Sequence, residues 1–208
     1  MRPFALLALL LIPLCEPVAA QPSAAPSPMT TTTSAPSVIW PPLEGWRTET
    51  IHFPLDFAPT LDYTGYEELR FSPEFGKSDR PLFFTYAFLW VVPETTVLDK
   101  ERLQRDLKTY FDGLMRAVAK DKKLEVATLD TKVVVTDAPP GPDQFTFLAQ
   151  IETFDAFFTK APLKLEMHVI RNVKQLDHWR AHYFEATTSP LQQQVLPELQ
   201  KARAALQQ

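Results

Sequence analysis

An uninterrupted apolar run, Leu82–Val92, dominates the hydrophobic pattern of the chain after its N-terminal region. Every position in it except Thr85 is apolar or aromatic, on both alternating sets of positions. A strand with one solvent-exposed face alternates apolar and polar residues, so a run that is apolar on both sets is typical of a strand covered on both faces. Pro81 and Pro93 bracket the run. The pattern therefore predicts the central, interior strand of a sheet over Leu82–Val92.

Two shorter segments before this run also predict strands. In residues 47–57 apolar side chains occupy every second position from Ile51 onward, with Pro54 on the polar side. Because proline removes a donor from the strand ladder, this strand is expected to lie at an edge of the sheet or to end there. A second strand is predicted over Tyr66–Phe71, with Glu68 and Arg70 forming a surface ion pair.

After Pro93 the spacing of apolar residues changes to three and four, which is typical of an amphipathic helix. The residues that carry this spacing are Leu103, Leu107, Tyr110, Phe111, Leu114 and Val118. Asp99 is placed to cap the N-terminus, and lysines gather at the other end, where positive charge suits the helix dipole. The pattern predicts a helix over 99–121. Gly113 within it costs about 1 kcal/mol relative to alanine and predicts close packing on the sheet.

The second half of the chain returns to alternation and predicts four consecutive strands, at about 132–136, 144–158, 163–170 and 179–187. In the second of these the aromatic positions change sides, which predicts a bulge or a twist near Thr153. Ser189 and Gln192 form a capping-box pattern before an apolar stripe that reaches Leu206. This stripe predicts a C-terminal helix that is kinked or divided at Pro197.

The resulting order, β-β-β-α-β-β-β-β-α, predicts an α+β domain with a largely antiparallel sheet, on which a long middle helix and a C-terminal helix are packed. This order of elements resembles the PsbP-type sandwich of extracytoplasmic α+β proteins. From the second half onward it also resembles a single-domain ligand carrier whose curved sheet grips a long C-terminal helix. Both resemblances lie in the order of elements and not in a residue motif, so they assign no functional residue.

The composition of the first forty residues differs from that of the rest. Residues 1–20 have the basic start, short apolar stretch and small-residue cleavage site of a secretory signal peptide. Residues 21–42 are rich in Pro, Ser, Thr and Ala, which predicts a flexible tether, and a single domain is expected over 43–208. We therefore expect the mature protein to be periplasmic or secreted, and no segment after the signal is a candidate membrane span.

The composition also excludes several kinds of chemistry. The only cysteine, Cys15, lies in the predicted signal; a lipoprotein anchored there is the less favoured alternative, because Leu14 occupies the place of the small residue that a lipobox requires. The mature chain then has no thiol for disulfides, nucleophilic catalysis or metal binding. A net charge of −4 does not suit nucleic acid, and no glycine-rich phosphate loop or Gly-x-Ser-x-Gly motif occurs.

The last predicted hairpin contains one candidate site. With its turn centred on Leu176, four polar side chains share one face of the sheet: Glu166, His168, Arg180 and His182. Such a cluster is a candidate binding site for an anion or, with less support, a metal. The alternative, which we favour, is a solvated face with ordinary cross-strand charge pairs.

Carboxylates and aromatic residues before the apolar run form a second set of candidates. Glu67, Glu68 and Glu74 are possible acid–base groups, but the first two point to opposite faces of the predicted strand and do not form a pair. The aromatic residues of this region either line a pocket or pack in the core: Trp46, Phe57, Tyr63, Tyr66 and Phe75. Packing in the core is the favoured interpretation.

Together these patterns favour a non-catalytic binding or accessory module of the cell envelope, without a cofactor or metal. Its expected partner is an envelope protein or a small ligand. The alternative is a small hydrolase or metal-dependent enzyme that uses the Glu, His and Arg face of the last hairpin.

Overall fold

The computed structural model describes residues 35–125, 129–188 and 192–206 of the chain. The chain divides into two units, and all described residues belong to the second, Ser34–Gln208. The predicted signal peptide, most of the predicted tether and the capping residue Ser189 lie outside the described residues.

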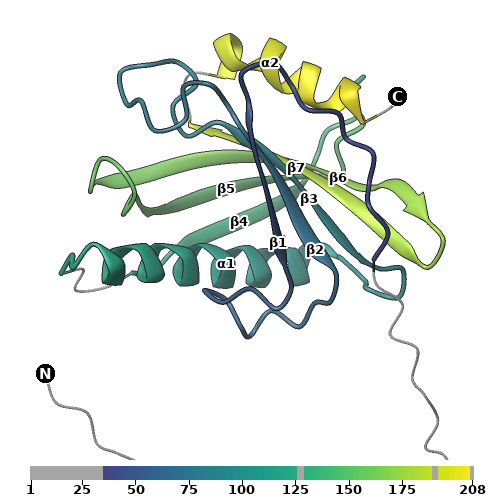
Figure 1. The fold of residues 1–208 in the computed structure, drawn as a ribbon, viewed down its shortest axis with the longest axis horizontal. Coiled ribbons are helices and arrows are strands. Elements are labelled where there is room, and N and C mark those ends of the chain that lie inside the picture. The colour runs from purple at the N-terminus through teal and green to yellow at the C-terminus, as the bar shows by residue number, and fades with distance from the viewer. Residues whose placement is uncertain (1–34, 126–128, 189–191, 207–208) are drawn as a thin grey trace, which may run out of the picture. The chain divides into compact units, whose positions relative to one another are not determined.

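Seven antiparallel strands form one sheet in the order β1-β2-β3-β7-β6-β5-β4. In chain order the strands are β1 (Arg47–His52), β2 (Tyr66–Phe71), β3 (Tyr86–Pro93), β4 (Lys132–Asp137), β5 (Phe147–Phe154), β6 (Pro162–Leu176) and β7 (Trp179–Thr188). The helices α1 (Lys100–Asp121) and α2 (Gln192–Ala205) lie on opposite sides of the sheet (Figure 1). The predicted α+β architecture and order of elements are confirmed. No helix within the described ranges is long and apolar enough to cross a membrane.

The two faces of the sheet carry two separate hydrophobic layers. The larger one lies between the sheet and α1 and includes Phe88 and Phe184; we call this side the α1 face. The smaller one lies on the α2 face and includes Leu89 and Tyr183, together with Ala202 of α2. Because successive residues of a strand point to opposite faces, β3 and β7 supply both layers and are buried on both sides.

The predicted interior strand is present but shorter than expected. β3 begins at Tyr86, and Leu82–Thr85 forms a turn in which Phe84 has a positive φ of 52°. The turn side chains Phe83 and Phe84 are buried, so an apolar pattern alone does not distinguish them from strand residues. β3 lies inside the sheet, while the middle strand by order is β7. β1 lies at an edge and ends at His52, before Pro54, as predicted.

Of the bulge or twist predicted near Thr153, the bulge does not form. β5 pairs with β6 in unbroken register to its end at Phe154. Asp155 then forms a turn, because its carboxylate accepts hydrogen bonds from three following backbone N–H groups at 2.8–3.0 Å. The irregularity lies instead in β6, between Ile170 and Lys174. In the C-terminal helix, α2 is not divided at Pro197 but continues through it.

The middle helix begins and ends where its sequence predicts. The side chain of Asp99 caps it by accepting the N–H of Arg102 at 2.8 Å. Gly113 allows a close approach, but to the loop carbonyl of Phe57 rather than to the sheet: a Cβ added to Gly113 would lie 2.0 Å from that oxygen. The predicted partner of Gly113 is therefore corrected.

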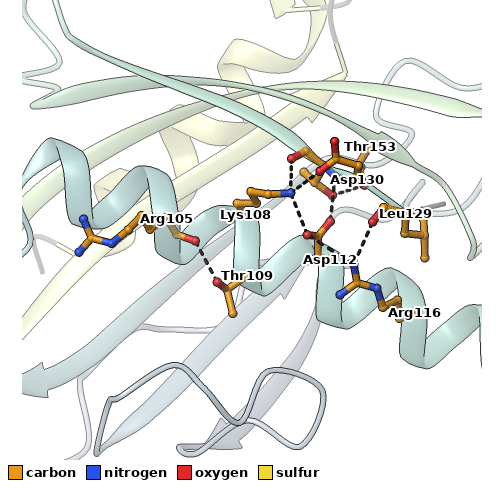
Figure 2. A network of polar contacts seen from close by, with 9 residues as sticks. Arg105, Lys108, Thr109, Asp112, Arg116, Leu129, Asp130 and Thr153 are labelled. Carbon is orange, nitrogen blue, oxygen red and sulfur yellow. Dashed lines mark hydrogen bonds and ion pairs between the residues drawn. The ribbon is translucent and has the colours of Figure 1, made fainter.

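A polar network joins α1 to the segment that enters β4 (Figure 2). Asp112 accepts the backbone N–H of Thr131 at 2.8 Å, and Lys108 lies between Asp112 at 3.0 Å and Asp130 at 2.6 Å. Burial acts to raise the pKa of Asp112, but the hydrogen bonds from Thr131 and the charge of Lys108 outweigh it and lower that pKa. This network sets the position of α1 over β4 and β5, against which the helix packs most closely.

The domain begins earlier than the predicted boundary at residue 43. Val38 and Trp40 are buried on the α2 face, and the Trp40 indole donates to the carbonyl of Ala202 at 2.9 Å. This segment also covers Arg70, whose guanidinium stacks on Trp40. The predicted ion pair of Glu68 with Arg70 forms at 2.5 Å, but Arg70 is buried rather than on the surface. The last part of the predicted tether, from Ala35, is thus part of the folded domain.

Candidate functional site

The four site residues predicted in the last hairpin do not share a face. Glu166 and His168 are on the α2 face, and their side chains meet at 3.1 Å. A turn centred on Leu176 would place Phe184 opposite His168, whereas the structure places Glu185 of β7 there. Arg180 and His182 belong to the other set of β7 positions, which pairs with Val92 and Trp90 of β3 on the α1 face.

The register differs from the prediction for two reasons. The hairpin turns at Asp177 and His178, so that Leu176 pairs with Trp179. The bulge then places three residues of β6, from Arg171 onward, opposite the single residue His182. A shift of one residue moves every side chain of a strand to the other face, and therefore the predicted cluster is separated.

On the α2 face Glu185 is the centre of a buried polar cluster. It accepts hydrogen bonds from Tyr183 at 3.0 Å and Arg203 at 2.5 Å and lies 3.0 Å from the His168 ring. Burial acts to lower the pKa of His168, but Glu185 and Glu166 outweigh it and raise that pKa. Because these groups bond to one another, the cluster joins β6, β7 and α2.

His182 has a different environment on the α1 face. Its Nδ1 accepts the backbone N–H of Asn172 at 3.3 Å, while its buried Nε2 has no partner among the described residues. Burial, followed by the charges of Arg171 and Arg180, lowers the pKa of His182 to about 4, so the ring is neutral at pH 7. Within the described residues, no group of three or more His, Cys, Asp or Glu side chains is placed to hold a metal ion.

A cavity of about 690 Å³ lies on the α1 face at the other end of the sheet. Because α1 packs closest to β4 and β5, the sheet face near β1 is left to loops and to the side of the helix (Figure 1). Phenylalanine rings from five parts of the chain surround this space: Phe57, Phe71, Phe75, Phe84, Phe157 and Phe158. Tyr86 of β3 and Tyr110 of α1 complete its aromatic lining.

The pairing of the first three strands positions the floor of this aromatic cavity. Residues that pair across antiparallel strands point to the same face. Three rows result: Ile51, Glu67 and Trp90; Glu49, Leu69 and Phe88; and Arg47, Phe71 and Tyr86. The β1 members of these rows, at the edge of the sheet, include the two exposed charges Arg47 and Glu49, while the β2 and β3 members are buried.

A buried carboxyl group lies beneath the aromatic cavity. Glu67 is 0 % exposed; its Oε1 accepts the Trp90 indole N–H at 3.1 Å, and its Oε2 lies 3.3 Å from the Tyr110 hydroxyl. Burial raises the pKa of Glu67 to about 8, against the opposing effect of those two hydrogen bonds and with a further rise from Glu49. No basic side chain in the described part of the chain forms an ion pair with Glu67, so the group is mainly neutral at pH 7.

Tyr86 presents a second buried polar group to the aromatic cavity. Its side chain is 3 % exposed and lines the cavity. Burial, followed by the nearby charge of Glu67, raises the pKa of Tyr86. Among the described residues, the fully buried side-chain polar atoms without a partner are Arg70 Nε and His182 Nε2, so the Tyr86 hydroxyl is not a buried unpaired group.

Sequence reasoning found part of this site. Of the aromatic residues proposed for a pocket or for the core, Phe57 and Phe75 line the cavity, whereas Tyr63 packs in the α1-face core, and Trp46 and Tyr66 lie in other clusters. The opposite directions of Glu67 and Glu68 were predicted correctly.

Other members of the site were missed. The burial of Glu67 was not anticipated, although a carboxylate on the same side of a strand as Leu69 and Phe71 is a local signal for it. Phe157 and Phe158 come from a distant turn, and no local pattern places them beside Phe75 and Phe84.

No family model, curated protein or solved structure matches the chain.

Proposed function

We propose that this protein is a non-catalytic extracytoplasmic binding module that holds one small apolar molecule in the aromatic cavity. The observation that carries the proposal is the cavity itself, about 690 Å³ and lined by six phenylalanine and two tyrosine side chains. Binding sites for small molecules typically enclose roughly 300–1,000 Å³ and are mainly apolar with a few convergent polar groups.

The lining supplies affinity in a simple way. Each 100 Å² of apolar ligand surface removed from water contributes about 2.5 kcal/mol before the costs of association are subtracted. Aromatic rings add edge and face contacts at low cost in side-chain entropy. A flat or chain-like apolar molecule that fits between α1 and the β1–β3 end of the sheet would therefore bind with useful affinity.

The extracytoplasmic location is supported by the sequence alone, through the signal-like residues 1–20 and the Pro- and Thr-rich stretch that follows. N-terminal sequencing of exported protein tests it, with Gln21 expected as the first residue. An intact Met1 or a lipid on Cys15 would contradict the proposed processing.

The alternative, an enzyme that uses Glu166, His168, Arg180 and His182, is less well supported. The first pair and the second pair lie on opposite faces of the sheet, and His168 is already bonded to Glu166 and Glu185.

The binding proposal is tested by fluorescence titration with N-phenyl-1-naphthylamine, an uncharged apolar probe. We expect saturable 1:1 binding with a blue-shifted emission. Leu114→Trp should weaken binding at least about tenfold, because Leu114 lines the cavity and the indole would fill part of it. Val134→Trp is the matched control, since Val134 is exposed on the edge strand β4 and does not line the cavity.

Thermal unfolding of both variants shows whether they are folded. Absence of saturable binding to the wild-type protein would overturn the proposal, and so would equal binding by the wild-type protein and a folded Leu114→Trp variant.

A further inference from the structure

We propose that two copies of this protein associate through the outer edge of strand β1, around a two-fold axis at Thr48. In this arrangement the two β1 strands run antiparallel, and Arg47 of each copy lies opposite Glu49 of the other. The inference goes beyond the proposed function and does not depend on it. It is carried by the open edge of β1 and by the order of the charges along that strand.

The sheet has two edge strands, β4 and β1, and α1 covers the first of them. The side chain of Gln104 accepts the backbone N–H of Val135 at 3.1 Å. Asp112 accepts the N–H of Thr131 at 2.8 Å, and Lys108 donates to the carbonyl of the same residue at 3.0 Å. These contacts use backbone groups that would otherwise be open to another strand. The edge at β4 is therefore blocked.

The backbone of β1 is open on its outer side. The N–H of Phe53 donates to Gly65 at 3.1 Å, and the hydrogen bonds of an antiparallel pair recur at every second residue. The odd-numbered residues of β1 therefore bond to β2, whereas Thr48, Thr50 and His52 direct their N–H and C=O groups away from it. All three are exposed, and no hydrogen bond to these backbone groups is found in residues 35–125, 129–188 and 192–206. They can bond to an added strand.

Both helices lie on other strands and leave the outer edge of β1 accessible. α1 packs most closely on β4 and β5, and α2 packs on β7 and β3 (Figure 1). Every residue of β1 except Ile51 is exposed. A second strand can therefore reach this edge without displacing a part of the domain.

The charges of β1 select a second copy as the added strand. Arg47 and Glu49 point to the same side of the strand and flank Thr48. Neither forms a salt bridge in the part of the chain that the structure describes, and Arg47 lies over the Phe71 ring at 4.5 Å. A single charge on an edge strand opposes pairing, but a two-fold axis at Thr48 places each charge opposite its counterpart. Opposite charges that face each other across antiparallel strands stabilise the pair.

The backbone groups fit the same register. Residues at equal distances from the axis face each other, so the two Thr48 residues exchange N–H···O=C bonds, and the N–H of Thr50 reaches the carbonyl of Trp46. The pairing ends there, because the Trp46 N–H already donates to Leu43 at 3.0 Å. An axis at Thr50 would instead place Glu49 opposite an apolar residue.

This association would bring the two aromatic cavities together. The two-fold axis of an antiparallel pair is perpendicular to the sheet, so the α1 faces of both copies lie on the same side. Arg47 and Glu49 line the cavity, and each therefore meets a charge of the other copy at the rim. Both copies then contribute residues to the rim of each candidate site.

Sedimentation velocity of the full chain over a range of concentrations tests the proposal, and we expect a reversible monomer–dimer equilibrium. Arg47→Glu leaves two acidic side chains beside Thr48, and Glu49→Arg leaves two basic ones, so like charges would face each other in either homodimer. Each variant should dimerise at least about tenfold more weakly than the wild-type protein. An equimolar mixture of the two variants should form the dimer again, because opposite charges then face each other.

Two further variants control the experiment. Lys132→Glu makes the same change of charge as Arg47→Glu at an exposed residue of the other edge strand, and it should dimerise like the wild-type protein. Thr48→Pro removes an outward N–H but no bond to β2, and it should abolish the dimer. Thermal unfolding shows whether each variant is folded.

Three outcomes overturn the inference. The first is a wild-type protein that stays monomeric at every concentration, whatever other chain pairs with β1. The second is a dimer that a folded Thr48→Pro variant leaves unchanged, because association then uses another surface. The third is failure of the two folded charge variants to associate when mixed. Binding of N-phenyl-1-naphthylamine is a separate measurement, so the binding function stands or falls independently.

Discussion

The carboxylate of Glu185 on the middle strand β7 and the guanidinium of Arg203 on α2 lie 2.5 Å apart, with side chains 0 % and 9 % exposed. Arg203 also pairs with Asp143 at 2.9 Å and stacks on Phe145 at 4.7 Å. One side chain of the C-terminal helix thus connects the centre of the sheet to the loop before β5. The pair determines how α2 is held on the sheet.

Removing one partner of this pair should destabilise the protein more than removing both. Arg203→Met leaves Glu185 buried with fewer donors and should lower the free energy of unfolding by about 3–5 kcal/mol. In the double variant Glu185→Gln/Arg203→Met the loss should be smaller, because no buried carboxylate is left without Arg203. Denaturant unfolding of the two single variants and the double variant measures the coupling energy, and strictly additive losses would contradict it.

His168 should stabilise the protein mainly at lower pH. Its folded-state pKa is raised by Glu185 and Glu166 against the effect of burial, so the folded state holds the proton more tightly than the unfolded state. This contribution is fully present below the unfolded pKa of about 6.5 and is lost as the pH rises through the folded value. The stability difference between the wild-type protein and His168→Gln should therefore shrink as the pH is raised from 6. Unfolding curves that stay parallel across this range would be inconsistent with the assignment.

His182, unlike His168, should stabilise the protein mainly at higher pH. Its pKa is lowered to about 4 by burial and by Arg171 and Arg180, so the contribution of the neutral ring is present above the unfolded pKa of about 6.5 and is lost as the pH falls toward 4. The difference between the unfolded and the folded pKa of His182 corresponds to about 3 kcal/mol of unfolding free energy. His182→Gln keeps an acceptor for the Asn172 N–H and does not titrate. Between pH 7 and 4 the free energy of unfolding should therefore fall less in His182→Gln than in the wild-type protein, by about that amount.

Gly113→Ala should destabilise the protein, although the same change in an exposed helix stabilises by about 1 kcal/mol. The added Cβ would lie 2.0 Å from the carbonyl oxygen of Phe57, a backbone atom that cannot move independently of its loop. Because Phe57 lines the aromatic cavity, the variant should also bind N-phenyl-1-naphthylamine more weakly. Thermal unfolding and probe titration check the two effects, and a more stable variant would show that α1 does not approach this loop.

The segment before β1 should contribute to stability. Trp40 is 4 % exposed, donates to Ala202 and packs edge-on against Tyr183 at 6.1 Å. Trp40→Ala should cost about 3–5 kcal/mol, and a chain that starts at Leu43 should lose at least as much. A chain that starts at Ser34 is the matched control and should unfold like the full-length protein. Equal stability of the two shortened chains would place the domain boundary at residue 43 after all.

Much of the fold could be predicted from the sequence, because the repeat of apolar residues is a local property. A period of two placed Glu67 and Glu68 on opposite faces, and a period of three to four with Asp99 as a cap placed α1 within one residue of its observed start. The start of the predicted interior strand was wrong because Phe83 and Phe84 are buried in a turn. Burial leaves the same apolar signature in a turn as in a strand.

The faces of the last hairpin could not be predicted in the same way. The alternation in β6 is clear, but its register against β7 depends on the turn at Asp177 and on the bulge after Ile170. Neither the turn nor the bulge changes the apolar pattern of the first part of β6. One residue of shift replaced Phe184 by Glu185 as the partner of His168, and so separated His168 from His182.

The sequence by itself determined the elements of this protein, their order, and which side chains of each strand point the same way, because these follow from backbone geometry over a few residues. Only the tertiary structure decided that Glu67 lies under an aromatic cavity and that Tyr86 lines that cavity. Those facts depend on where α1 lies on the sheet and on Phe157 and Phe158, which approach Phe75 and Phe84 from a distant turn. Contacts between residues far apart in the chain arise from packing, and packing is a property of the whole domain rather than of any one segment.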